Sequence, residues 1–216
     1  MACWQRAGTE RVSVLWALWS VAGFWIGAVP FPVLVGRLLA GVDVRSYGDH
    51  NPGAFNAGRA AGWGAGFLAA LLDGLKGAIP AGIAIWGFGI RGWAQVPVAL
   101  APVLGHAFSP FLGGRGGKAV GVTFGIWTAL RPAEGPLMLG VFMALFFAVL
   151  ASDAWSVLLM MVGLLAHLLL RGSRAVEIAV WILNVAVLAW KHRAGLGEPL
   201  RLRGWVVRVV RFTERS

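Results

Sequence analysis

Two polar, glycine-rich stretches stand out in a chain that is otherwise mostly apolar. The first, GDHNPGAFNAGR (48–59), combines three glycines with two asparagines and ends in an arginine. The second, GHAFSPFLGGRGGKAVG (105–121), contains a GGRGGK run that leads into an apolar segment. Glycine lets backbone N–H groups turn toward an anion, and a lysine or arginine then neutralises its charge. Both stretches therefore suit phosphate binding.

A second interpretation of these stretches stays open at the level of residue types. They could be flexible connections that carry positive charge on one side of a membrane. Two such loops on the same predicted side favour phosphate binding over this interpretation. Other phosphate motifs fail: GFGIRG (87–92) does not follow a strand, and GGRGGKA lacks both the first glycine and the Ser/Thr of a P-loop.

The composition places the elements that hold these loops in a bilayer. Of 216 residues, 58% are hydrophobic and 13% are charged. A soluble domain of this length could not bury so much apolar surface. The predicted fold class is therefore all-α, a polytopic integral membrane protein with transmembrane helices and glycine-rich cytoplasmic loops.

The charge balance points to anionic partners. The formal net charge is +10, and the basic residues lie at helix ends and in the tail. Anionic lipid headgroups or anionic substrates explain this pattern, whereas nucleic acid does not, because no basic nucleic-acid-binding motif is present. Cys3 is the only cysteine, so neither a disulfide framework nor a cysteine metal site is expected.

Seven apolar segments are expected, with six as the alternative. They cover roughly 12–40, 60–88, 93–111, 118–131, 136–151, 154–170 and 175–190. The first is too long for a signal-peptide core and should bend near Pro30 and Pro32. The fourth is short enough to be tilted or re-entrant. Small residues at helical spacing, Gly23/Gly27 and Gly117/Gly121/Gly125, predict close helix packing.

The predicted topology puts both glycine-rich loops and the C-terminus on one side. That side carries twelve Lys and Arg residues against six on the other, which favours a cytoplasmic C-terminus and depends on the tail. We divide the chain into one domain, 1–200, and a tail, 201–216. In the tail, arginines and valines fall on opposite helical faces, which predicts a basic amphipathic helix for an anionic membrane surface: Arg208, Arg211 and Arg215 against Val206, Val209 and Val210.

Two charged residues lie inside the second apolar segment. Asp73 and Lys76 are three residues apart, and charges at membrane depth are usually paired or face a cavity. An internal ion pair that orients this helix is the favoured interpretation. A direct substrate contact from Lys76 is the alternative, and a small transporter is a third hypothesis.

The order of motifs resembles one known family. The run GAVPFPVLVGRLLAGVDVRSYGDHNPGAFNAGRAAG…LLDGLKGAIP is similar to the first signature of the bacterial acyl-phosphate:glycerol-3-phosphate acyltransferases, and GHAFSPFLGGRGGKAVGVTFG to the second. KHRAGL, from Lys191, resembles a third signature only faintly. The resemblance implies a seven-span enzyme of the bacterial inner membrane with a cytoplasmic active site. Such enzymes move a fatty acyl group from acyl phosphate to glycerol 3-phosphate, giving lysophosphatidic acid for phospholipid synthesis, without metal, cofactor or acyl-CoA.

The resemblance also implies roles for individual residues. By motif, the catalytic candidates are Arg59, Lys118 and His192. Together with the loop argument above, the substrate-binding candidates are Asn51, Gly53, Asn56, His106, Gly114, Arg115, Gly116 and Gly117. An acyl phosphate is already activated, so holding two anions together and neutralising them can suffice for catalysis. The substrate's own phosphate would then take the proton of the attacking hydroxyl.

Departures from the family pattern motivate an alternative function. Asp49 and His50 replace Ser-Gly, and Phe55 replaces a small hydroxyl residue. Further departures are Ser109 for proline, Arg115 for lysine, Ala119 for glycine, and Ala194-Gly195 in the third signature; Ser152 or Ser156 could supply the hydroxyl that this family has between the fifth and sixth segments. The alternative is a divergent lipid-binding membrane protein that is non-catalytic or uses another acceptor.

Overall fold

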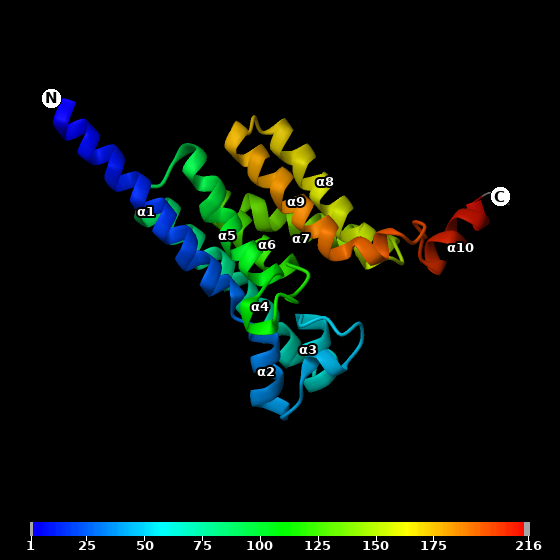
Figure 1. Ribbon diagram of the computed structural model, residues 1–216. Helices are drawn as coiled ribbons and strands as arrows, with labels where there is room; N and C mark the ends of the chain where they lie inside the picture. Colours follow the sequence, from blue (N-terminus) through cyan, green and yellow to red (C-terminus); the bar gives the residue numbers. More distant parts are fainter. Residues whose placement is uncertain (1, 214–216) are drawn as a thin grey trace.

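The computed structural model describes residues 2–213, and their regular secondary structure is helical, apart from one isolated antiparallel bridge between Leu150 and Leu202. The long helices pack beside one another in a bundle (Figure 1). Their bounds are α1 Ala2–Ala28, α2 Phe31–Ala40, α3 Ala54–Ala61, α4 Trp63–Gly82 with a π turn at Ile83–Gly87, α5 Gln95–Ala107, α6 Val120–Leu130, α7 Glu134–Val149, α8 Asp153–Leu170, α9 Ala175–Leu196 and α10 Gly204–Thr213. The predicted all-α class is confirmed.

The helices are long and apolar enough for a multi-span membrane protein. Among the described residues, five stretches can cross a bilayer by length and composition: Val14–Ala40, Trp63–Gly87, Gly92–Leu112, Asp153–Leu170 and Ala175–Leu196. Val120–Leu130 and Glu134–Val149 are apolar but shorter. Eleven helical residues span about 16 Å, against a hydrocarbon core of about 30 Å. The count of seven spans therefore stays a prediction.

Glycines let two helix pairs approach backbone to backbone. Between α4 and α6, a methyl group on Gly125 would overlap the carbonyl of Gly74, and one on Gly77 would reach Val122. Between α1 and α5, a methyl group on Gly27 would overlap the backbone of Pro102. Gly27 and Gly125 are among the small-residue positions predicted to pack helices, whereas Gly117 of the same predicted run lies before α6 and packs on the His106 ring.

A bend separates α1 from α2 at the predicted prolines. Pro32 has no N–H to give to the Ala28 carbonyl, which would otherwise lack a helical partner. The hydroxyl of buried Ser109 donates to this carbonyl at 2.6 Å, and the ammonium of Lys76 donates to the next one, Val29, at 2.7 Å. Ser109, a departure from the family pattern, thus supports the bend.

The charged pair within α4 is internal. The Lys76 ammonium lies 2.7 Å from the Asp73 carboxylate, and both side chains are buried. This confirms the predicted ion pair, and it places Lys76 away from the surface. The transport hypothesis was motivated by two charges inside a membrane segment. These charges have each other and the Val29 carbonyl as partners, so they no longer support that hypothesis.

The polar connections gather at the two ends of the bundle. At one end, the 41–53 loop meets the loop before α6, and the α7–α8 connection pairs with residues 201–203 through Leu150 and Leu202. At the other end, Arg131 pairs with Glu177 at 2.8 Å and joins the α6–α7 and α8–α9 connections. Both glycine-rich loops and the C-terminal tail therefore share one end, as predicted.

Candidate active site

The first glycine-rich loop folds around Asn56. This buried side chain, in the first turn of α3, donates to the Asp49 carboxylate at 2.8 Å and to the Asn51 carbonyl at 2.9 Å. Its own oxygen accepts from Arg59 at 3.4 Å. Gly48 has a positive φ of 56°, and any side chain there would overlap Arg59 and Asn56. The glycine therefore lets the chain pass directly over the guanidinium.

The second loop packs on the end of α5. A methyl group on Gly117 would overlap the ring of His106, and one on Gly116 would overlap the His106 carbonyl. Lys191, on α9, donates to the carbonyls of Ala107 at 2.9 Å and Gly116 at 2.8 Å. The loop thus packs against His106 and is held by the hydrogen bonds from Lys191.

Lys118 joins the two loops. Its ammonium lies 2.6 Å from Oδ2 of Asp49, across 69 residues of sequence. Burial alone would raise the pKa of Asp49, but hydrogen bonds from Lys118 and Asn56 outweigh it and lower that pKa to about 2. Asp49 is therefore an ionised carboxylate between the loops at any physiological pH.

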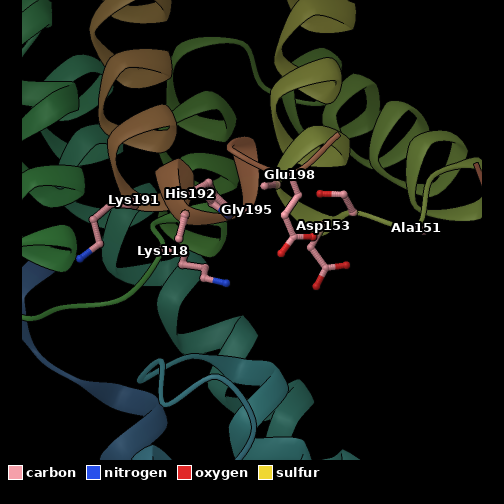
Figure 2. Close-up of a pocket in the computed structure, with 10 residues that line it drawn as sticks. Lys118, Ala151, Asp153, Lys191, His192, Gly195 and Glu198 are labelled. Atoms are coloured by element: carbon pink, nitrogen blue, oxygen red, sulfur yellow. The ribbon is translucent and has the colours of Figure 1, made fainter. Parts of the chain in front are cut away.

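A pocket of about 260 Å³ opens on the other side of Lys118. Figure 2 shows Lys118, Lys191 and His192 near one another, with Asp153 and Glu198 facing them across the pocket. Its lining comes from the α7–α8 connection and the end of α9: Lys118, Ala151, Ser152, Asp153, Ala154, Lys191, His192, Ala194, Gly195 and Glu198.

The tautomer of His192 follows from its hydrogen bond. Nδ1 lies 2.8 Å from the Leu188 carbonyl, which can only accept, so Nδ1 carries the proton. In the neutral ring Nε2 then bears the lone pair. The ring can accept a hydrogen bond from a substrate hydroxyl in this pocket, while Lys118 beside it can neutralise an anion.

Comparison with known proteins decides the family. Residues 17–201 match the family model described as glycerol-3-phosphate acyltransferase. This chain belongs to the glycerol-3-phosphate acyltransferase family. The predicted family and the predicted enzyme class, an acyltransferase, are thereby confirmed.

Individual members of the glycerol-3-phosphate acyltransferase family match most of the chain. The Rubrobacter xylanophilus enzyme is 39% identical over 83% of this chain and 88% of its own length. Glycerol-3-phosphate acyltransferase 1 of Thermotoga maritima is 43% identical over 54% of this chain and 58% of its own length. A crystal structure of PlsY, an integral membrane glycerol 3-phosphate acyltransferase, in its glycerol 3-phosphate form is 30% identical with a TM-score of 0.76, over 84% of this chain and 90% of that one. The lysophosphatidic acid form matches at 29% identity and the same TM-score.

In this acyltransferase, most of the predicted site residues lie at one end of the bundle. Asn56 and the backbone N–H of Asn51 bind Asp49, and Arg59 donates to Asn56. Lys118 contacts Asp49 and also lines the pocket of His192. The predicted binding glycines shape both loops: Gly53 precedes α3, Gly114 has a positive φ of 79°, and Gly116 and Gly117 rest on His106.

Other predicted residues lie apart from the pocket. His106 is buried behind Gly117 and lies 3.7 Å from Asp73, so the structure brings it to the loop and not to the surface. Arg115 is exposed on the tip of the second loop. Ser152 lines the pocket, whereas Ser156 is buried and donates to the Phe146 and Ser152 carbonyls.

Sequence reasoning missed three charged residues of the site. Lys191, Asp153 and Glu198 line the pocket but were not proposed as site residues. Lys191 directly precedes His192 in the third signature, which was the only available signal. Asp153 and Glu198 lie in segments without a recognisable motif.

Proposed function

We propose that this protein transfers a fatty acyl group from acyl phosphate to the 1-hydroxyl of glycerol 3-phosphate. The products are lysophosphatidic acid and phosphate, and the reaction begins phospholipid synthesis. The observation that carries the proposal is the position of Lys118, which touches Asp49 of the first loop and also lines the pocket of His192. Two phosphate-bearing substrates can thus be held side by side. The related PlsY crystal structures, one in a glycerol 3-phosphate form and one in a lysophosphatidic acid form, support a substrate and a product of this reaction.

The proposed chemistry needs no covalent intermediate on the protein. The hydroxyl oxygen of glycerol 3-phosphate attacks the acyl carbon, the bond from that carbon to the phosphate oxygen breaks, and the hydroxyl proton goes to the leaving phosphate. Arg59 and Lys118 neutralise the two phosphates, and backbone N–H groups of the glycine loops contribute further donors. Before the attack, His192 orients the acceptor by accepting a hydrogen bond through Nε2. Proximity and charge neutralisation supply the rate enhancement.

We place the protein in the bacterial inner membrane with the site on the cytoplasmic side. The excess of basic residues at the end that carries the site supports this orientation. The tail, 201–216, includes the helix α10, and residues 214–216 with Arg215 lie outside the described residues. Arg208 is exposed there together with Trp205, which suits an interfacial helix on anionic headgroups.

A two-substrate assay on purified protein tests the proposal. Palmitoyl phosphate and glycerol 3-phosphate should yield lysophosphatidic acid and phosphate in equal amounts. Replacing Lys118→Ala should lower kcat/KM by about 100-fold, because a charge that stabilises the developing phosphate anion is lost.

The matched control is Arg37→Ala. Arg37 also pairs with an aspartate on the same end of the bundle, Asp43 at 3.3 Å, but lies on α2 away from the pocket. Its loss should change kcat/KM by less than about twofold, as for most exposed ion pairs. No transfer by the wild-type protein under conditions where a family enzyme is active would refute the proposed function.

A further inference from the structure

Asp49 puts a negative charge at the point where the two glycine-rich loops meet. Its Oδ2 contacts the Lys118 ammonium at 2.6 Å, and its Oδ1 accepts from Asn56 at 2.8 Å. The pattern of the family has a neutral serine at this position. This chain therefore has a carboxylate in contact with Lys118, the residue that the family resemblance assigns to phosphate binding.

We propose that Asp49 is an internal competitor of the substrate phosphate: it holds Lys118 until a phosphate group displaces it, and so sets the affinity for phosphate-bearing substrates. The inference rests on the proposed function, since it takes Lys118 as a phosphate ligand. Either glycerol 3-phosphate or acyl phosphate could supply the displacing group, because both present the same phosphate chemistry.

The geometry allows the exchange without unfolding the loop. Oδ1 is tied to the loop by the Asn56 amide and, at 3.3 Å, by the backbone N–H of Asn51. Oδ2 faces Lys118, whose side chain is one-third exposed and sits on a flexible four-carbon stem. A phosphate that takes Lys118 breaks one contact, while the contacts of Oδ1 keep the carboxylate in place.

Charge explains why the exchange has a cost. A carboxylate in contact with an ammonium neutralises most of the field of the ammonium, and the carboxylate repels an incoming phosphate dianion. Arg59 is exposed, and its hydrogen bond to Asn56 is long, 3.4 Å. An incoming phosphate can therefore meet Arg59 first and take Lys118 second. Since the pKa of Asp49 is lowered to about 2, the competition persists over the whole working pH range.

The test compares phosphate affinity in the wild-type protein and in Asp49→Asn, with Asp49→Ser as a second variant. Isothermal titration calorimetry with inorganic phosphate measures binding without turnover. We expect both variants to bind phosphate about three- to tenfold more tightly, a modest gain because exposed ion pairs are weak. A role of Asp49 that is only structural would not tighten binding.

Two comparisons make the test specific. Asp43→Asn removes another loop carboxylate, which pairs with Arg45 at 2.6 Å and contacts neither Lys118 nor the pocket, and phosphate affinity should stay unchanged. In a Lys118→Met background, Asp49→Asn should give a smaller gain, because the contested ammonium is absent. An equal gain in that background would overturn competition for Lys118.

Steady-state kinetics identify which phosphate does the displacing. A lower KM for glycerol 3-phosphate alone assigns the subsite to the acceptor, and a lower KM for palmitoyl phosphate alone assigns it to the donor; either supports the proposal. Equal or weaker phosphate binding by Asp49→Asn overturns it. Because calorimetry needs no catalysis, an inactive wild-type protein would refute the proposed function and leave the binding comparison to decide this inference.

Discussion

At the scale of single residues, the candidate site depends on side chains that fix other side chains and the loop backbone. Asn56 fixes both Asp49 and Arg59, and Lys191 fixes the loop that presents Lys118. The residues that would touch substrate are thus few, and their positions depend on buried or half-buried neighbours. The affinity of the site should respond to those neighbours as well as to Arg59 and Lys118.

Lys191→Met tests this dependence. The variant keeps an apolar stem but loses the hydrogen bonds to Ala107 and Gly116, each worth about 1.5–3 kcal/mol when the donor is charged and less at this half-buried position. We expect faster amide hydrogen exchange in 113–118 and an activity about tenfold lower, which corresponds to about 1.4 kcal/mol.

Arg193→Met is the control for Lys191→Met. Arg193 is exposed on the same helix, donates to the nearby Trp190 carbonyl and lies over the Trp190 ring. Its loss should leave the exchange rates of the loop unchanged. Identical behaviour of the two variants would contradict the anchoring role of Lys191.

Residue types predicted part of the site and left part of it out. Arg59, Lys118 and His192 stand in recognisable motifs, so sequence reasoning reached them. Glu198 belongs to no recognisable motif. Its place at the pocket depends on a long-range contact, because the indole N–H of Trp155 donates to its backbone carbonyl at 3.0 Å across 43 residues. His106 is polar and was expected to face substrate, but the second loop packs over it.

At the scale of elements, two departures from the family pattern have a conformational cost. His50 and Ala119 replace glycines, and both have positive φ, 59° and 64°. Such a conformation costs a non-glycine residue about 1–2 kcal/mol. His50 recovers part of it through a 2.8 Å hydrogen bond between its Nδ1 and the Arg45 carbonyl. The chain thus lacks two glycines of the family pattern at these turns, but it keeps Gly116 and Gly117, which touch His106.

The close approach of α4 and α6 gives a prediction about stability. Gly125→Ala would force the Gly74 carbonyl aside, which should destabilise the bundle by about 1–3 kcal/mol. Thermal unfolding in detergent, followed by tryptophan fluorescence, should give a lower Tm.

Gly140→Ala is the matched control for this substitution. Gly140 is also within an apolar helix, α7, but among the described residues an added methyl group would meet no atom within 4 Å outside its own turn of helix. Its Tm should not fall, because alanine is the better helix former. A Tm for Gly125→Ala equal to that of the wild type would contradict the packing described here.

At the scale of the whole molecule, the chain brings its polar connections to two ends and keeps an apolar bundle between them. The apolar helices, the bend at Pro30 and the shared end of both loops could be predicted, because hydrophobic length and proline act locally, while the count of seven spans stays a prediction. The pairing of residues 201–203 with the α7–α8 connection could not, because it joins two segments about 50 residues apart mainly through backbone atoms, which leave no pattern of residue types.

Truncations test whether this pairing supports the pocket. A chain that ends at Arg203 keeps the hydrogen bonds of Ala151 to Arg201 and of Arg203 to Val149 and Leu150. It should retain activity in neutral detergent within about twofold. A chain that ends at residue 199 loses them, and its activity should fall about tenfold, since each hydrogen bond contributes about 0.5–1.5 kcal/mol. Equal activity of the two truncated proteins would contradict a supporting role for the pairing.

The central claim is that Lys118 brings both loops and the His192 pocket into one phosphate-binding site. An experimentally determined structure with bound glycerol 3-phosphate tests this claim most directly. Our account predicts the phosphate within hydrogen-bond distance of Lys118 and Arg59, with Oδ2 of Asp49 no longer in contact with the ammonium. A phosphate bound at the opposite end of the bundle, beside Arg131 and Arg174, would contradict it.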